Sequence, residues 1–234
     1  MRPPPQPRVL QMTQRRDFLK QASLLAAGSL AAGSLDPRSL DAQAAGQAQG
    51  EWDMSWTAKV TGKYRMAFDS PEIAEGVVFH QARSFLAGYK ATLGLGDSDL
   101  TAVMILRHKG VPLACGDAVW EDGEIAKQND LKDPVTGEPA KRNPFINIPA
   151  GSRYALTWAD GAMDTLISRG VIVLACDLAL GGVIAQVAER RKIPRQDARK
   201  LVHDSLVPGV IRMPSGIFAT SHAQGLGCGF LTTG

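Results

Sequence analysis

The sequence predicts an α/β protein built on a mostly parallel five-stranded sheet with helices on both faces. Short apolar runs that suit buried strands alternate along the chain with segments whose apolar residues recur at helical spacing. The run at 171–175, Val-Ile-Val-Leu-Ala, is apolar on both faces. Such a run is typical of an interior strand in a parallel sheet.

The first half of this pattern begins with a predicted strand at 63–68. Ser70 with Pro71 and Glu72 then predicts a helix start, because serine caps helices and proline suits the first helical position. One helical face follows, made of Ala74, Val78, Ala82, Phe85 and Tyr89. The continuous apolar run at 100–106 predicts the second strand.

The second half repeats the alternation. Thr157 and Asp160 are spaced as a capping box for a helix that ends at Gly170. The remaining predicted elements are the strand at 171–175, helices at 182–191 and 195–206, a strand at 210–213, a helix at 216–224 and a strand at 228–231. The proline-rich stretch 117–151 is long for a connection, and we expect a lid, an oligomer contact or a mobile insertion there.

Residues 1–44 resemble a twin-arginine translocation leader. Arg15 and Arg16 precede Phe-Leu-Lys, an apolar run at 22–35 and the small-residue sequence Ala-Gln-Ala at 42–44. We therefore expect the translocase as a partner during export, and a periplasmic protein. The apolar run is too short to act as a stable membrane anchor. A flexible segment at 45–62 and one domain at 63–234 are expected to follow.

The leader also accounts for the charge. The chain has a formal net charge of +3, and residues 1–45 hold six basic and three acidic side chains, so the remainder is neutral. A neutral remainder gives no reason to expect nucleic acid as a partner.

Cys176 is the leading candidate for chemistry. It ends the clearest strand, a few residues before a predicted helix, and the carboxyl ends of strands face the ligand crevice in doubly wound sheets. A thiol near a helix N-terminus is more readily ionised. The alternative is a structural cysteine, because cysteine is among the residues most often buried as small hydrophobes.

Several segments together resemble the DsrE/DsrF-like family of sulfur-relay proteins. They are 102–114, 170–176, 206–210 and 214–219, followed by Ala-Gln-Gly at 223–225. The resemblance implies a three-layer sandwich that forms homo-oligomers. It also implies that the cysteine after the third strand, here Cys176, accepts a persulfide sulfur from a thiol-bearing donor or passes it to a thiol-bearing acceptor. The stretch 117–151 is longer than in compact relay subunits, and export argues against tRNA thiolation.

Three further residues complete the expected site. Arg107 and His108 end a strand at the same edge as Cys176, where they would bind an anion or carry a proton, and Asp177 is a further ligand-binding candidate. Cys115 forms a disulfide with Cys176 in one interpretation, which makes the chain a thiol redox protein. In another, the three cysteines are separate thiols.

No metal or cofactor is expected. The chain has no His-x-x-x-His or Cys-x-x-Cys spacing for zinc, and the glycines at 94 and 96 lack the third glycine of a dinucleotide-binding loop. The leading hypothesis is a sulfur carrier, and the alternative is a non-catalytic binding or assembly module with a structural cysteine.

Overall fold

The computed structural model describes residues 52–133, 135–148 and 159–233. The predicted leader and Thr157 of the predicted capping box lie outside them. The elements, in chain order, are η1 (Ser55–Lys59), β1 (Tyr64–Ser70), η2 (Ala74–Gly76), α3 (Val77–Leu93), η3 (Asp97–Asp99), β2 (Leu100–Leu106), η4 (His108–Ala114), α4 (Asp117–Trp120), α5 (Glu124–Gln128), η5 (Ala159–Gly161), α7 (Met163–Ser168), β3 (Ile172–Cys176), α8 (Asp177–Arg191), α9 (Arg195–Asp204), β4 (Val210–Met213), α10 (Gly216–Gly225) and β5 (Gly229–Thr232).

The predicted fold class is confirmed. The five strands form one sheet in the order β4-β3-β2-β1-β5, and every neighbouring pair is parallel. In the register, Ser70 lies opposite Leu106, Leu106 opposite Ala175, and Cys176 opposite Met213. The carboxyl ends of β1 to β4 therefore meet along one edge of the sheet.

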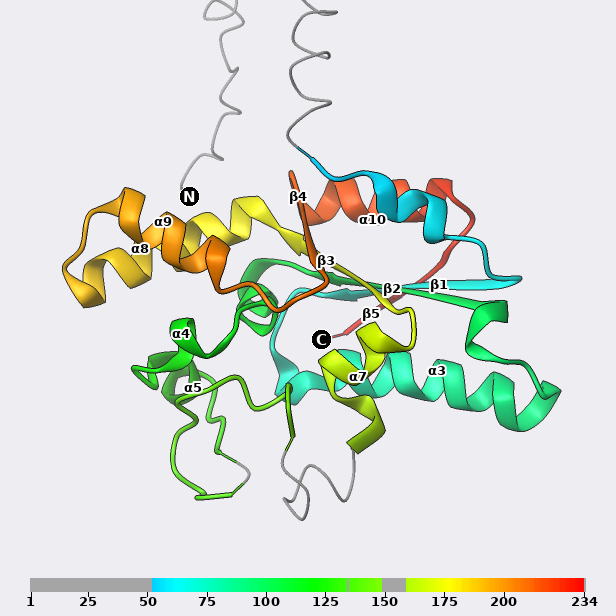
Figure 1. Ribbon diagram of the computed structural model, residues 1–234, viewed down its shortest axis with the longest axis horizontal. Coiled ribbons are helices and arrows are strands. Elements are labelled where there is room, and N and C mark those ends of the chain that lie inside the picture. The colour runs from blue at the N-terminus through cyan, green and yellow to red at the C-terminus, as the bar shows by residue number, and fades with distance from the viewer. Residues whose placement is uncertain (1–51, 134, 149–158, 234) are drawn as a thin grey trace, which may run out of the picture. The chain divides into compact units, whose positions relative to one another are not determined.

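Helices cover both faces of the sheet (Figure 1). On one face, α3, α7, α8 and α9 bury a large core that includes Phe68, Met104 and Val173. On the other face, α10 and η1 bury a smaller core that includes Val103 and Leu174. Successive residues of the interior strands point to opposite faces and both faces are covered, which explains why β2 and β3 are buried throughout.

Two predicted helix starts are wrong. Ser70 is still part of β1, and its hydroxyl donates to the Glu72 carbonyl oxygen at 2.8 Å instead of capping a helix. The chain then turns through left-handed backbone at Ala74, Glu75 and Gly76 before α3 begins at Val77. The predicted helix at 182–191 instead begins at Asp177, directly after Cys176.

Two segments expected to be loose contribute to the core. In the stretch 117–151, Trp120 and Phe145 are buried with α3 and β2, and the Trp120 indole donates to the Pro112 carbonyl oxygen at 3.2 Å. The expectation of a mobile insertion is therefore wrong for the described part of this stretch. In the segment 45–62, Trp56 and Val60 are buried against α10, so its described part is not a flexible linker.

Candidate functional site

A cavity opens between the N-terminal ends of α8 and α10. α8 follows β3 and packs on one face of the sheet, whereas α10 follows the neighbouring β4 and packs on the other face. In doubly wound sheets a ligand crevice forms where successive connections change face. This cavity has a volume of about 700 Å³. The polar and ionisable side chains that line it include Glu72, Arg107, His108, Lys109, Cys176 and Ser215.

Cys176 lines this cavity and is held rigidly. It is the last residue of β3 and the N-cap residue of α8, and it pairs with Met213 of β4. Only 6% of the residue is exposed. Because Cys176 is the N-cap residue, its sulfur lies at the positive end of a 15-residue helix. The side chain makes no capping hydrogen bond there. The field of such a helix end favours the charged form of a thiol.

Arg107 brings a fixed positive charge to the same cavity. It follows β2, and its guanidinium donates to both carboxylate oxygens of Asp69, each at 2.7 Å. The hydrogen bond to Asp69 raises the pKa of Arg107 above its ordinary value, and the charges of Asp69 and Cys176 act in the same direction while burial opposes them. Arg107 and Cys176 follow the paired residues Leu106 and Ala175 on neighbouring strands, and both line the cavity.

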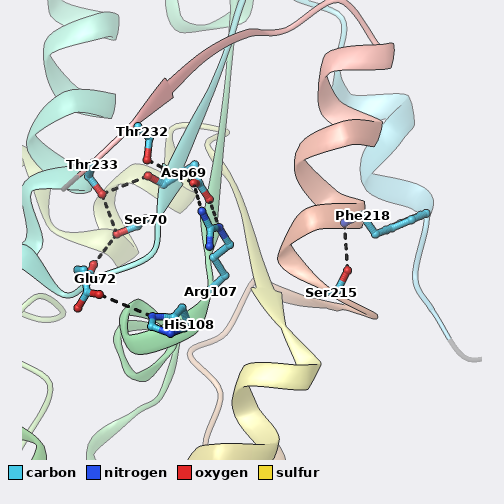
Figure 2. Close-up of polar contacts among 9 residues, drawn as sticks. All are labelled: Asp69, Ser70, Glu72, Arg107, His108, Ser215, Phe218, Thr232 and Thr233. Carbon is cyan, nitrogen blue, oxygen red and sulfur yellow. Dashed lines mark hydrogen bonds and ion pairs between the residues drawn. The ribbon is translucent and has the colours of Figure 1, made fainter. Parts of the chain in front are cut away.

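Asp69 is held in turn by the C-terminal strand (Figure 2). The Thr232 hydroxyl donates to Asp69 Oδ2 at 3.3 Å, and the Thr233 backbone N–H and hydroxyl donate to the Asp69 carbonyl oxygen at 2.8 and 3.1 Å. The Thr233 hydroxyl also contacts Ser70 Oγ at 3.3 Å. Asp69 was not among the expected site residues, although a carboxylate at the end of a strand facing the predicted crevice is itself an indication of function.

His108 and Lys109 form an exposed basic rim on the cavity. His108 Nδ1 and Lys109 Nζ lie 3.6 and 3.9 Å from Glu72 Oε1. His108 has a φ of +51°, a left-handed conformation that is uncommon for residues other than glycine. Gly110 allows this turn to pack tightly, because a Cβ there would lie 2.4 Å from the Ser70 carbonyl oxygen. Strained backbone of this kind is frequently found at functional sites.

Apolar side chains complete the cavity mouth. Leu178 in the first turn of α8 and Ile217 in the first turn of α10 both line the cavity, yet they are 76% and 69% exposed. Neither residue was among the expected site residues, because an apolar side chain at a helix start carries no signal for exposure in the sequence. The cavity therefore combines one thiol, a basic rim and an exposed apolar edge.

Asp177, predicted to bind ligand, faces a different direction. It does not line the cavity. Its Oδ1 accepts from Arg212 Nη1 at 2.7 Å and lies 3.5 Å from His203 Nε2. Burial is the main cause that lowers the pKa of His203, and the Arg212 charge adds to it. Arg212 also lies over the Trp52 ring, with its guanidinium carbon 5.5 Å from the ring centroid. This cluster joins α8, α9, β4 and the first described residues.

The other two cysteines lie in different surroundings. All three thiols are free, so Cys115 and Cys176 are not joined by a disulfide. Cys115 is completely buried, and burial raises its pKa to about 12. Burial also raises the pKa of Cys228, which precedes β5, while the Arg65 charge opposes the shift. Neither Cys115 nor Cys228 lines the cavity.

Comparisons with known proteins leave the family of this chain open. No protein-family model matches it, and no curated protein matches it. Among solved structures, the chain is similar to a protein of unknown function from Methanobacterium thermoautotrophicum, with 16% identity and a TM-score of 0.37, covering 73% of this chain and 99% of that one. A likeness of this strength carries no functional argument.

Two searches of the described residues were negative. Within 52–133, 135–148 and 159–233, no three His, Cys, Asp or Glu side chains are grouped closely enough to hold a metal ion. Over the same ranges, none of the helices has the length and apolar character needed to cross a bilayer.

Proposed function

We propose that this chain is an exported, DsrE-like sulfur carrier that holds sulfane sulfur as a persulfide on Cys176. The observation that carries the proposal is the position of this thiol. It lies at a helix N-terminus, in a cavity at the carboxyl edge of the sheet that Arg107 also lines. Helix ends and neighbouring cations are the surroundings in which cysteine becomes nucleophilic.

The transfer needs no cofactor. The Cys176 thiolate attacks the outer sulfur of a persulfide donor, R–S–SH. A new S–S bond forms on Cys176, the donor S–S bond breaks, and the donor leaves as a thiolate that keeps the electron pair and takes up a proton. A thiolate of the acceptor then attacks the outer sulfur on Cys176 and releases Cys176 as a thiolate. Both steps are displacements at sulfur by a thiolate, of the same kind as thiol–disulfide exchange.

Residues that line the cavity stabilise the negative charges that form on sulfur during the transfer. Arg107 is held by Asp69 and offers a permanent positive charge to the thiolate and to the persulfide anion that replaces it. His108 is 61% exposed at the mouth, where it can exchange a proton with the leaving thiol and with water. Leu178 and Ile217 give an apolar contact for the organic part of a donor.

The size of the cavity supports an organic donor. At about 700 Å³ it is comparable with sites for small organic molecules. It is many times larger than an inorganic sulfur anion, which would leave most of the lining, including the exposed Leu178 and Ile217, without a contact.

The second candidate is a non-catalytic binding or assembly module in which Cys176 is structural. The low exposure of Cys176, 6% of the residue, favours it. In that case native protein would not react with thiol reagents at Cys176, and the cavity would bind a ligand without covalent change.

Sulfur loading of single variants tests the proposal. Purified protein is incubated with an organic persulfide, glutathione persulfide, and desalted, after which bound sulfur is measured by cyanolysis and intact mass. We expect wild type and Cys115→Ala to carry one sulfane sulfur each and Cys176→Ser to carry none, since Cys115 with its pKa of about 12 has a thiolate fraction of about 10⁻⁵ at pH 7. If Cys176→Ser carried as much sulfur as wild type, the proposal would be wrong.

Periplasmic location and homo-oligomeric assembly remain predictions. The first rests on the leader and the second on the family resemblance. Cell fractionation and light scattering of the processed protein are the corresponding measurements.

A further inference from the structure

Asp69 is the most deeply buried charged group near the candidate site, and it does not line the cavity. It is 2% exposed on β1, two strands away from Cys176 on β3. Both of its oxygens accept from Arg107, and one accepts from Thr232 as well. A carboxylate paired in this way holds a guanidinium in one orientation, because the fork of two N–H donors matches its two oxygens.

Arg107 is confined from a second side by α10. A Cβ on Gly216 would lie 2.6 Å from both Cβ and Cδ of Arg107. The side chain of Arg107 therefore runs against the backbone of the α10 N-terminus on one side and ends on Asp69 on the other. These two contacts leave the Arg107 side chain little freedom to adopt another rotamer.

The contacts form a chain across four strands. Thr232 on β5 donates to Asp69 on β1, and Asp69 accepts from Arg107 after β2 (Figure 2). Arg107 in turn lies one residue beyond Leu106, which pairs with Ala175, so it neighbours Cys176 on β3 across the cavity that both residues line. We propose that Asp69 is a positioning residue, which fixes Arg107 beside Cys176 and, through its own negative charge, limits how strongly Arg107 favours the Cys176 thiolate. This inference rests on the proposed function of Cys176.

The other ionisable side chains near Cys176 have partners of their own. On the cavity side, Glu72 faces His108 and Lys109 from the segment after β1. On the α8 side, Asp177 is paired with Arg212 of β4 and faces His203 of α9. The positive end of α8 is common to all variants of the experiment below. Of these charges, Arg107 is therefore the one whose effect on the Cys176 thiolate depends on Asp69.

The test is the pH dependence of Cys176 alkylation by iodoacetamide, with the modified cysteine identified in peptides by mass spectrometry. Asp69→Asn keeps the shape and one acceptor for Arg107 but removes the negative charge. We expect its alkylation midpoint to move to lower pH, with a rate at pH 7 about threefold to tenfold above wild type. Asp69→Ala releases Arg107, so we expect its midpoint to move to higher pH.

A second background separates positioning from general effects. With Arg107→Met, changing Asp69 to Ala should no longer raise the midpoint, because no guanidinium remains for Asp69 to orient. If Asp69→Ala does not fold, as judged by circular dichroism, Arg107→Lys tests instead whether the orientation of the cation matters. It keeps the positive charge but loses the two-point attachment to Asp69. It should raise the midpoint.

Two results would overturn the inference. One is an unchanged midpoint in folded Asp69→Asn. The other is an equally large rise of the midpoint in Asp69→Ala with and without Arg107. Sulfur loading of wild type is measured in parallel. If wild type takes up no sulfur while the Asp69 variants shift the midpoint as expected, the carrier function fails and the positioning role of Asp69 stands.

Discussion

Two arginine–aspartate pairs with the same bonding lie at opposite edges of the sheet. At the carboxyl edge, Arg107 donates twice to Asp69, at 2.7 Å each. At the amino edge, Arg169 before β3 donates twice to Asp97 before β2, at 2.9 and 3.0 Å. The pairs differ in their surroundings, since the Asp69 side chain is 2% exposed and that of Asp97 is 34% exposed.

This difference shows that burial and neighbours decide what an ion pair does. Asp97 and Arg169 join two connections beside water, where charges are screened and a pair stabilises weakly. Asp69 cannot exchange its partner for water, so its charge stays bound to Arg107, and Arg107 stays beside Cys176 and the cavity. We infer that the Arg169–Asp97 pair has a structural role, connecting two loops, and that the Arg107–Asp69 pair is part of the candidate site.

Removing the arginine of each pair tests this contrast with the largest expected effect. Arg107→Met leaves Asp69 buried without its partner, which should lower the free energy of unfolding by about 3 kcal/mol. The control, Arg169→Met, should lower it by less than about 1 kcal/mol, because Asp97 can be hydrated. Urea unfolding at pH 7 measures both. Equal losses would contradict the distinction between the two pairs.

A smaller perturbation moves Arg107 without removing it. Gly216→Ala places a methyl group against the Arg107 side chain, and such overpacking costs about 1–3 kcal/mol. We also expect slower alkylation of Cys176, since its neighbouring cation is displaced.

Gly181→Ala in α8 is the matched control. A Cβ at Gly181 meets nothing within 4 Å, so this variant should gain up to about 1 kcal/mol from helix propensity and alkylate as wild type does. If the two alanine variants behaved alike, Arg107 would not be seated by α10.

The helices and strands could be predicted because the spacing of apolar residues within each segment indicates its secondary structure. The predicted strands at 100–106 and 210–213 agree with β2 and β4 to the residue. α8 begins five residues before the predicted start at Gly182, and its buried residues Leu180, Val183, Ile184 and Val187 form one helical face. Helical spacing identified the elements more reliably than it identified their ends.

The partners within the site could not be predicted in the same way. Cys176, Arg107 and His108 were expected at one edge, and the structure places all three on one cavity. Asp69 and Arg107 are 38 positions apart in the chain, and only the register of β1 on β2 brings them together. The register of β4 on β3 likewise places Arg212 opposite Ala175, which explains why Asp177 pairs with it away from the cavity.

The smallest expected effect is the pH dependence of the amino-edge pair. The hydrogen bond from Arg169 lowers the pKa of Asp97 below its ordinary value of 3.8. A carboxyl group with a lowered pKa stabilises the folded state above the pKa of the unfolded chain, and this contribution is lost as the pH falls through the folded value. Asp97→Asn should thus be less stable than wild type by under about 1 kcal/mol at pH 7, and the difference should shrink as the pH falls below about 4. Urea unfolding of both proteins across this range measures it. A difference that grew toward low pH would mean that the charge of Asp97 does not stabilise this edge of the sheet.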